Sequence, residues 1–426
     1  NGKLIYLKGW FIMAFSIDTR NFYQNILAEI QDNGLYKDER IICDVQGAEI
    51  EVEFPKGASP KKLINMCSNN YLGLSSHPDV IKQAHYALDF RGYGLSSVRF
   101  ICGTQDIHKQ LEQRLTDFLG TEDTILFSSC FDANGAVFDA LLDENDIMIS
   151  DRLVHASIID GMRLAKAQHD TFKHSDMSHL RSKLEQYKDC PHKMIITDGV
   201  FSMDGDIAKL NEIVELAEEY EAMVFVDDSH ATGFIGKKGR GVAELYNVLG
   251  KVDIITTTFG KALGGASGGC VSGRKELIDM LRQRGRPYLF SNTLAPMIAW
   301  TTMKVLDILE KSTERRDKLA ENTIWWRKAL QDAGFIIVPG ESPIVPIMFY
   351  DAKLAQAFSQ DLYDEGVFAV GFFFPVVAQG QARIRTQLSA AHNIEHLERA
   401  LAAFVKIGAK FNILGKTKDE LLQMKI

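Results

Sequence analysis

Residues 256–269 are TTTFGKALGGASGG, and their composition decides how the rest of the chain is interpreted. They follow an apolar run, VDII, and set one lysine, Lys261, among glycines and other small residues. Lysine is rarely buried without a partner, and the small neighbours leave space beside its amine. A desolvated lysine loses its proton more readily, and the neutral amine is the nucleophile that condenses with a carbonyl compound. The stretch therefore predicts a carbonyl-binding lysine, with a surface lysine on a turn as the simpler alternative.

Three other segments that follow apolar runs carry residue types suited to chemistry: SSCFDANG at 128–135, DGVFSMDG at 198–205 and DDSH at 227–230. In open α/β sheets, ligands bind beyond the carboxyl ends of the strands. SSCFDANG leads from a predicted strand into a predicted helix, whose first N–H groups could bind an anion; taken alone, it could equally be a capped turn. DDSH puts a carboxylate and an imidazole three residues apart, which suits a small ligand, a metal or a helix cap.

Together these sites describe one cofactor. Pyridoxal phosphate has a phosphate that binds a helix N-terminus, a ring nitrogen that pairs with a carboxylate, and an aldehyde that condenses with a lysine. A rival reading takes GASGG at 265–269 as the G-x-S-x-G elbow of an esterase, with Ser267 as the nucleophile. That elbow needs a strand directly before it and a helix directly after it. Here the flanking segments are GKALG and CVSG, which disfavour it.

The composition excludes several other classes of protein. The chain has 426 residues, 46% of them hydrophobic, and 48 basic against 56 acidic side chains. A formal charge of -8 makes nucleic acid an unfavourable partner. The six cysteines form no C-x-x-C pair, so we expect reduced thiols, no zinc site and a cytoplasmic protein. No apolar stretch approaches the roughly 18 residues of a membrane span.

The pattern of residues 69–302 favours an α/β fold, because helical periodicity alternates there with short apolar runs. We expect a mostly parallel central sheet flanked by helices. Apolar runs that predict strands lie at 124–128, 147–151, 193–199, 223–230 and 252–259, and predicted helices lie at 108–120, 135–143 and 210–221.

Four regions follow from the changes in pattern. Residues 1–12 are expected to be a non-native or upstream extension, 13–68 an N-terminal segment forming a small lobe, 69–302 the large cofactor-binding domain, and 303–426 a smaller α+β domain. The N-terminal segment is predicted to start with a helix at 20–34 and to contain a strand at 48–54. The last region is predicted to contain helices at 316–334, 355–366 and 395–411, and strands at 342–350 and 382–388.

These motifs resemble those of the α-oxoamine synthase family of fold-type-I pyridoxal phosphate enzymes, from about residue 15 to 411. The similarity also rests on NNYLGL at 69–74, HASIIDG at 155–161 and VDDSHATGF at 226–234. SVRFICGTQDIH at 97–108, RPYLFSN at 286–292 and GFFFPVVAQGQARIRTQ at 371–387 are similar to the acetyltransferase branch. The chain departs little from the family pattern, apart from TTTFGK where a glycine and a leucine are common.

The resemblance implies a role for each site residue. Lys261 would hold the cofactor covalently and act as the general base, and Asp227 would pair with the ring nitrogen. The other cofactor-binding residues would be His155 stacked on the ring, Ser202 and His230 at the ring hydroxyl, Cys130, Phe131 and Thr258 at the phosphate, and Ser291 and Asn292 at the phosphate of the neighbouring subunit. Arg385 and Asn69, with His155, would bind the substrate, and the catalytic set would be Lys261, His155, Asp227 and His230. No metal is implied.

Arg383 and Arg385 lie two residues apart on one predicted strand, so the residues alone leave both as candidates for the substrate carboxylate. The fork of an arginine suits a carboxylate because it makes two parallel hydrogen bonds. The resemblance favours Arg385.

The implied reaction condenses glycine with acetyl-CoA to 2-amino-3-oxobutyrate and CoA, or runs in reverse in threonine degradation. The expected partners are the substrates, a second copy in a homodimer with shared active sites, and a functionally coupled threonine dehydrogenase. Two alternatives stay open. One is another α-oxoamine synthase, of the 8-amino-7-oxononanoate, 5-aminolevulinate or serine palmitoyl type; the other is a non-catalytic partner subunit, which the presence of Lys261, Asp227, His230 and Arg385 disfavours.

Overall fold

The computed structural model describes residues 16–33 and 35–424, and its largest element is a seven-stranded sheet. The strand order is β4-β10-β9-β8-β7-β5-β6. The strands are β4 (Asp123–Phe127), β5 (Ile147–Asp151), β6 (Gln168–Phe172), β7 (Lys193–Asp198), β8 (Met223–Asp227), β9 (Ile254–Thr258) and β10 (Gly269–Gly273). β9, β8, β7, β5 and β6 pair in parallel, and β10 is antiparallel to both of its neighbours. The predicted mostly parallel sheet is confirmed.

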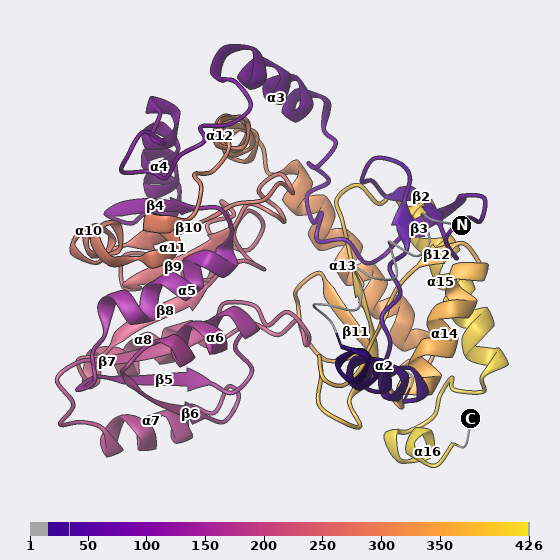
Figure 1. Cartoon of the computed structure of the whole chain (residues 1–426). Coiled ribbons are helices and arrows are strands. Elements are labelled where there is room, and N and C mark those ends of the chain that lie inside the picture. Colours follow the sequence, from indigo (N-terminus) through magenta and orange to yellow (C-terminus); the bar gives the residue numbers. More distant parts are fainter. Residues whose placement is uncertain (1–15, 34, 425–426) are drawn as a thin grey trace.

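Helices cover both faces of this sheet, which explains why its inner strands are apolar throughout (Figure 1). All six residues of β7 are buried. Met194 and Ile196 belong to one apolar cluster, which includes side chains of α5 (Cys130–Leu141), while Ile195 belongs to another with α8 (Leu210–Glu219). The other helices of this part are α3 (Pro78–Arg91), α4 (Asp106–Leu119), α6 (Ala156–Leu164), α7 (Met177–Gln186), α9 (Val242–Leu245), α10 (Lys275–Arg284), α11 (Arg286–Phe290) and α12 (Pro296–Lys311).

A smaller α+β region lies beside the large sheet, to the right in Figure 1. One of its sheets has the order β11-β14-β13, and the other has the order β1-β2-β3-β12. Its strands are β1 (Ile41–Ile42), β2 (Glu49–Glu53), β3 (Lys61–Asn65), β11 (Ile344–Tyr350), β12 (Val367–Phe368), β13 (Gly371–Phe372) and β14 (Ala382–Gln387). Its helices are α13 (Glu314–Asp332), α14 (Ala352–Asp364), α15 (Ile394–Lys410) and α16 (Lys418–Leu422).

The N-terminal and C-terminal parts of the chain share one sheet, because β3 pairs in parallel with β12. The predicted boundary at residue 302 falls within α12, which packs on α3 and α4. The proposed extension at 1–12 lies outside the described residues.

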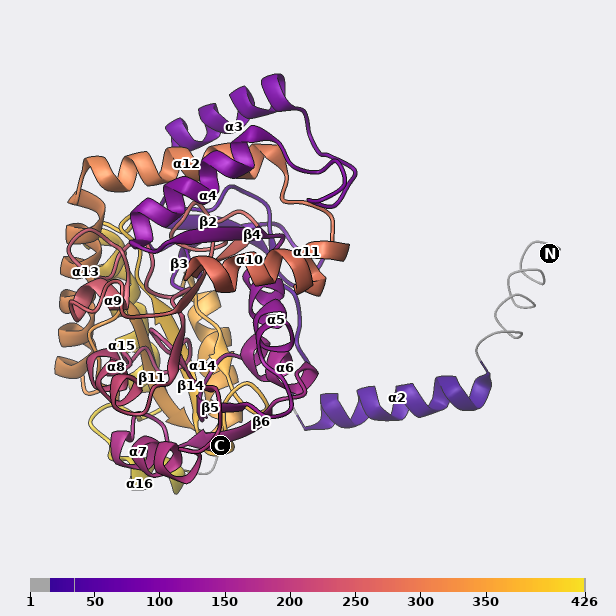
Figure 2. The same ribbon diagram turned by 90° about the vertical axis from the view of Figure 1, so that its left-hand side faces the viewer.

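The predicted N-terminal helix is present as α2 (Ile17–Asp32), and Figure 2 shows it extending away from the rest of the molecule. None of its side chains is buried, and Phe22, Tyr23 and Leu27 are among its exposed apolar residues. An amphipathic helix gains most of its stability from packing its apolar face, so this face is available for a further contact.

Two strands of the large sheet were not predicted. β6 is an edge strand with the sequence QHDTF, of which only Phe172 is buried. β10, GCVSG, is fully buried but rich in small residues. Neither has the apolar or alternating pattern by which a strand is recognised, because the first faces solvent and the second packs its backbone closely against its neighbours. Among the described residues, no helix is long and apolar enough to cross a membrane.

Candidate functional site

A cavity of about 230 Å³ lies at the carboxyl ends of the parallel strands. Parallel strands all end at the same edge of a sheet, so the residues that follow β7, β8 and β9 meet there. The cavity is lined by Ser129, Cys130, Phe131, Asn134, His155, Ser157, Asp198, Val200, Asp227, Ser229, His230, Thr258 and Lys261.

Lys261 reaches this cavity from the turn that joins β9 to β10. The Phe259 amide donates to the Gly268 carbonyl, and the Gly265 amide donates to the Phe259 carbonyl, so the turn folds back on itself. Gly265 has a φ of 82°, and a Cβ there would lie 2.3 Å from Ser75 Oγ. Burial lowers the pKa of the Lys261 amine, while the negative charge of Asp227 opposes that effect. The glycine-rich stretch therefore folds so that a lysine with an easily lost proton faces the cavity.

Asp227 ends β8 and is 6% exposed. Its Oδ2 accepts a hydrogen bond of 2.7 Å from Asn134 Nδ2, and its Oδ1 accepts one of 3.0 Å from the Ser229 amide. Each oxygen keeps a second lone pair for a ligand, because a carboxylate oxygen can accept two hydrogen bonds. The carboxylate is therefore held in place and can still bind a protonated ring nitrogen.

A chain of hydrogen bonds connects Asp227 to His155. Asn134 Nδ2 also donates to Ser157 Oγ at 2.8 Å, and Ser157 Oγ lies 2.7 Å from His155 Nδ1. His155 Nδ1 accepts the Ser157 amide at 3.3 Å, so we assign the proton of the neutral ring to Nε2. Asn134 and Ser157 were not predicted as site residues, although Asn134 lies within the quoted SSCFDANG segment.

His230 is buried and is connected through Tyr71 to Gln387 of β14 in the small region. Its Nδ1 lies 2.8 Å from the Tyr71 hydroxyl, which also accepts a hydrogen bond from Gln387 Nε2 at 3.3 Å. Burial lowers the pKa of His230 well below its ordinary value, and the positive charge of Lys261 acts in the same direction. His230 is therefore neutral near pH 7.

The N-terminus of α5 lies at one end of the cavity. Ser129 caps the helix by accepting a hydrogen bond from the Asp132 amide, and the amides of Cys130 and Phe131 begin the first turn, where helical geometry provides no carbonyl partner. Gly269 lies against this turn, since a Cβ there would be 2.6 Å from the Cys130 nitrogen. Thr258 Oγ1 accepts the Gly260 amide at the same edge. This arrangement fits a phosphate group.

Asp198 is a further carboxyl group in the cavity that was not predicted as a site residue. It is 3% exposed, lies opposite Asp227 in the β7–β8 register, and accepts a hydrogen bond from the His155 amide. Burial raises its pKa well above the ordinary value, and the charge of Asp227 adds to this effect. Asp198 could have been identified from the sequence, because it heads the DGVFSMDG segment.

The two candidate arginines of β14 differ in their partners. Arg383 Nη1 donates to the Asp204 carboxylate at 2.6 Å and to the Met203 carbonyl. Arg385 Nη1 donates only to a carbonyl, that of Ser202, at 2.7 Å, and its Nε is buried without a hydrogen-bond partner. Arg383 is thus neutralised by a carboxylate, whereas Arg385 keeps its charge and a free donor.

The predicted site residues fall into two groups in the structure. Cys130, Phe131, His155, Asp227, His230, Thr258 and Lys261 line the cavity itself. Ser202, Arg385, Asn69, Ser291 and Asn292 are not among its lining residues. Ser202 contacts Arg385, the Asn69 Oδ1 is buried without a partner, and Ser291 Oγ lies 3.5 Å from Ser128 Oγ.

The residues that line the cavity fit pyridoxal phosphate: helix amides with a glycine packed against them, a buried carboxylate, and a lysine with a lowered pKa. They do not fit the esterase alternative. Ser267 is exposed, and the segment continues into strand β10 where the elbow requires a helix.

Comparison with known proteins identifies the family that the chain resembles. The aminotransferase class I and II family matches residues 61–404. The 2-amino-3-ketobutyrate coenzyme A ligase of Escherichia coli K12 is 51% identical over 398 residues, covering 92% of this chain and 99% of that protein. The mitochondrial 2-amino-3-ketobutyrate coenzyme A ligase of Homo sapiens is 48% identical and covers 91% of this chain and 92% of that protein.

A more distant group of enzymes is also similar. The 8-amino-7-oxononanoate synthase of Thermosipho melanesiensis is 44% identical, covering 91% of this chain and 97% of that protein. The structure of S. paucimobilis serine palmitoyltransferase with bound PLP and myriocin superposes with a TM-score of 0.87 at 30% identity, over 92% of this chain and 99% of that one. On this similarity and on the site described above, the chain belongs to the aminotransferase class I and II family, as its resemblance to fold-type-I pyridoxal phosphate enzymes predicted.

Proposed function

We propose that the protein is a pyridoxal-phosphate-dependent glycine C-acetyltransferase. It condenses glycine with acetyl-CoA to give 2-amino-3-oxobutyrate and CoA, and it catalyses the reverse cleavage when 2-amino-3-oxobutyrate and CoA are supplied. The observation that carries the proposal is the convergence of Lys261, Asp227 and the α5 N-terminus on one cavity. The 51% and 48% identical relatives, both named 2-amino-3-ketobutyrate coenzyme A ligase, indicate the substrates.

The residues of the cavity divide the chemistry between them. When bound, pyridoxal phosphate supplies an aldehyde that captures the amino group of glycine and a ring that accepts electrons from its α-carbon. Asp227 would keep the ring nitrogen protonated, and the amides of Cys130 and Phe131 would hold the phosphate. His230 and Ser202 are proposed at the ring hydroxyl, and His155 on the ring face.

Lys261 is the residue that transfers the proton of the glycine α-carbon. Its lowered pKa lets the amine be neutral once it is free, so it can remove a proton from the glycine α-carbon as a general base. The negative charge of Asp227 raises the pKa of this amine, and the positive charge of Arg385 lowers it. Attack of the α-carbon on the acetyl thioester carbonyl would form the C–C bond and break the C–S bond. The proton taken up by Lys261 would then pass to the thiolate, so that CoA leaves as the thiol.

Arg385 is proposed to bind the glycine carboxylate, with help from Asn69. Arg385 keeps a buried donor, Nε, without a hydrogen-bond partner, and Asn69 could donate to the carboxylate through its side-chain NH₂ group. An unpaired buried donor is costly, and a carboxylate would satisfy the arginine. Arg383 is the less suitable residue because Asp204 already neutralises it.

The thioester is proposed to enter through a second cavity of about 410 Å³ that shares Phe131 and Ser157 with the first. Arg284 and Arg286 line this cavity and could pair with the phosphates of CoA. Asp132, Asp139 and Asp160 line it as well, so the charge there is mixed. Replacing both arginines with alanine should raise the KM for acetyl-CoA and leave that for glycine unchanged.

We further propose a cytoplasmic homodimer that acts together with a threonine dehydrogenase. The exposed apolar side chains of Tyr93, Phe100, Ile101 and Phe290 support a subunit interface near Ser291 and Asn292, which would reach the phosphate of the other subunit. Sedimentation of the purified protein tests the dimer.

A substrate screen tests the function. Glycine, alanine and serine are assayed with acetyl, succinyl, pimeloyl and palmitoyl thioesters, and release of free CoA is measured. We expect glycine with acetyl-CoA to be preferred. A preference for alanine with pimeloyl-CoA would assign the chain to the 8-amino-7-oxononanoate synthases, with which it shares 44% identity in one case. Borohydride reduction followed by peptide mapping should recover the cofactor on Lys261.

A further inference from the structure

A histidine outside the cavity connects the ends of three neighbouring strands. His174 lies between β6 and α7; its Nδ1 is 3.0 Å from Asp151 Oδ1, and its Nε2 is 2.8 Å from Asp206 Oδ2. Asp151 ends β5, and Asp206 lies in the loop that follows β7. Both ring nitrogens face carboxylate oxygens, which accept hydrogen bonds, so both nitrogens donate and the ring is an imidazolium.

The surroundings of His174 favour the protonated, positively charged form of its ring. The two carboxylates raise the pKa of His174 to about 10, although burial acts in the opposite direction. Phe201 packs its ring edge to face against the imidazole at 4.5 Å, and the Ser175 amide donates to the second oxygen of Asp151. The three side chains form one fixed unit, which we call the His174 bridge: Asp151, His174 and Asp206.

One end of the bridge holds the turn that carries His155. Asp151 is 2% exposed, and its Oδ1 also accepts a hydrogen bond from the Leu153 amide at 2.8 Å. The turn that starts at Asp151 therefore leads directly to His155, which caps α6.

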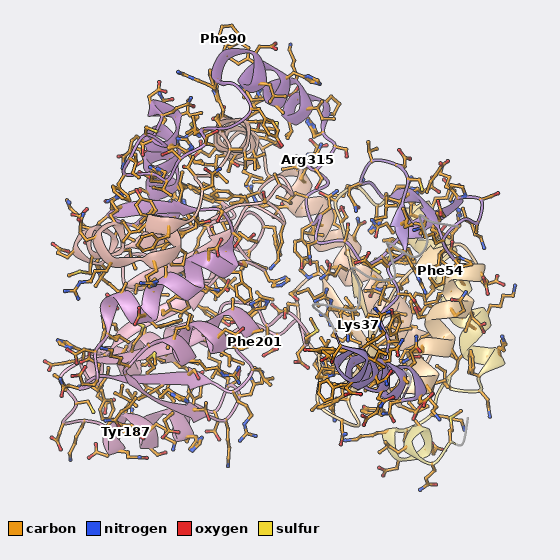
Figure 3. The ribbon with its side chains drawn as sticks, in the orientation of Figure 1. Lys37, Phe54, Phe90, Tyr187, Phe201 and Arg315 are labelled. Carbon is orange, nitrogen blue, oxygen red and sulfur yellow. The ribbon has the colours of Figure 1, made fainter. Side chains whose placement is uncertain are left out.

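The other end holds the loop at residues 199–208. The Phe201 amide donates to the Asp206 carbonyl, and the Gly205 amide donates to the Phe201 carbonyl, so the loop is closed between these residues. Its outer side accepts hydrogen bonds from the small region: Ser202 carbonyl from Arg385, and Asp204 carboxylate from Arg383. Figure 3 shows Phe201 on the side of the large unit that faces the small region.

We propose that His174 is a positioning residue for amino-acid binding: as an imidazolium it fixes the loop that holds Arg385, and thereby sets the distance between Arg385 and the cavity. Asp151, His174 and Asp206 do not line the cavity. The effect on Arg385 passes through loop 199–208, whose Ser202 carbonyl accepts a hydrogen bond from Arg385. The proposal rests on the proposed function only in that Arg385 binds the carboxylate of the amino-acid substrate. It does not depend on which acyl thioester reacts.

The test compares His174→Gln with His192→Gln. His192 also bonds a carboxylate, Asp146, but it makes one such contact and its side chain is 66% exposed. For His174→Gln we expect the KM for glycine to rise about tenfold, below the roughly hundredfold that a 1 Å misplacement can cause, with kcat and the KM for acetyl-CoA nearly unchanged. His192→Gln should leave all three constants unchanged.

A second variant and a spectroscopic measurement keep the proposal falsifiable. Asp206→Asn removes one carboxylate from a partly exposed position and should raise the KM for glycine in the same way. Proton NMR of the wild-type holoenzyme at pH 8 should show two slowly exchanging imidazolium N–H resonances that His174→Gln lacks. Equal glycine constants for His174→Gln and His192→Gln, or a neutral His174 in the spectrum, would overturn the proposal. If the screen instead selects alanine or serine, the proposed function fails and the same comparison is made with that amino acid.

Discussion

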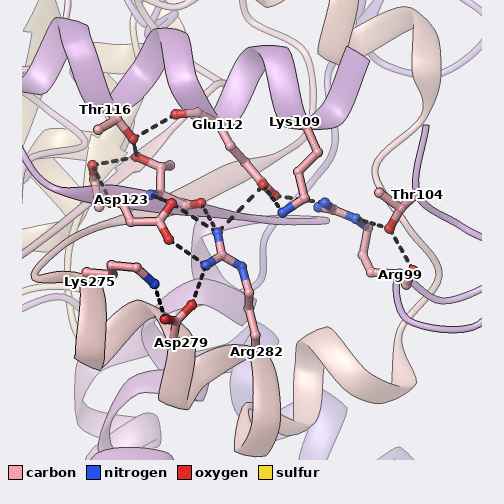
Figure 4. Close-up of polar contacts among 11 residues, drawn as sticks. Arg99, Thr104, Lys109, Glu112, Thr116, Asp123, Lys275, Asp279 and Arg282 are labelled. Carbon is pink, nitrogen blue, oxygen red and sulfur yellow. Dashed lines mark hydrogen bonds and ion pairs between the residues drawn. The ribbon is translucent and has the colours of Figure 1, made fainter. Parts of the chain in front are cut away.

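Two regions of the molecule bury charged side chains, and they differ in whether each charge has a close partner of opposite sign. In the first, at the carboxyl edge of β7–β9, Lys261, Asp198 and Asp227 share a small cavity without forming close ion pairs. In the second, between α4, β4 and α10, each carboxylate is bonded directly to one or more cations (Figure 4). Burial shifts the pKa of a charged group that has no partner, and a close partner of opposite sign offsets that shift.

The paired region, which we call the α4–α10 network, is centred on Glu112. Its two oxygens lie 2.8 Å from Arg99 Nη2 and 2.6 Å from Lys109 Nζ, and Arg282 Nη2 is 3.6 Å away. Arg282 also bonds Asp123 and Asp279. The network connects α4 and α10 to the loop that carries Arg99, so its charged side chains stabilise the fold.

The unpaired region keeps its groups ready to change protonation. Lys261 has a lowered pKa, and Asp198 has a raised one. Asp228, the next residue in the chain after Asp227, does not line the cavity; it accepts hydrogen bonds from Thr232 and the Val242 amide, and burial raises its pKa to about 7. Strongly shifted groups in a cavity, such as Lys261 and Asp198, are typical of catalytic sites. Incomplete pairing, more than burial itself, therefore distinguishes the functional region.

The largest expected effect is a loss of kcat when the Lys261 amine is removed. Lys261→Ala should lower kcat by about 10⁴-fold, because it removes both the covalent attachment and the general base. Steady-state release of CoA measures it, and borohydride mapping should recover no cofactor on the chain. Ser267→Ala is the matched control from the same turn and should keep nearly full activity; a loss there would revive the esterase alternative.

Breaking the α4–α10 network should affect stability. Glu112→Gln leaves Arg99, whose side chain is 3% exposed, without its charge partner, and should lower the free energy of unfolding by about 3–5 kcal/mol. Urea unfolding followed by tryptophan fluorescence measures this. Lys109→Gln removes a partner that is 54% exposed and should change the free energy by less than about 1 kcal/mol. Equal effects of the two variants would show that burial does not decide the energetics of the network.

The two arginines of β14 test whether a charge without a partner binds substrate and a charge with a partner does not. Arg385→Lys should raise the KM for glycine about tenfold or more, because lysine cannot make two parallel hydrogen bonds to a carboxylate. Arg383→Lys keeps a cation beside Asp204 and should leave this KM within about twofold. Steady-state kinetics with varied glycine separates them, and the reverse order would assign the carboxylate to Arg383.

The smallest effect is a pH dependence of stability. The pKa of His174 is about 10 in the folded protein and about 6.5 in an unfolded chain. Its contribution is therefore fully present below pH 6.5 and is lost as the pH rises towards 10. His174→Gln should lower the free energy of unfolding by about 2 kcal/mol at pH 6 and by less at pH 9. A difference that grows with pH would contradict the imidazolium assignment.

Much of the site could be predicted because its residues follow apolar runs directly. Lys261, Asp227 and the SSCFDANG segment each lie at the end of a strand that is recognisable from its own residues. Asn134 and Ser157 lie within the quoted segments SSCFDANG and HASIIDG, but their roles could not be predicted. Asn134 acts through hydrogen bonds to Asp227 and Ser157, which are 93 and 23 residues away in the chain. His174 was missed for the same reason, and β6, which precedes it, was not recognised as a strand.

The fold class, the cofactor and the residues at the strand ends could be predicted from the amino-acid sequence, because periodicity and local composition act within a few residues of one another. Which of Arg383 and Arg385 keeps a free donor, how Asn134 holds Asp227, and the pairing of β3 with β12 became clear from the tertiary structure. These outcomes depend on partners far away in the chain, and the free energy of a hydrogen bond or an ion pair is set by burial and geometry that no local pattern contains.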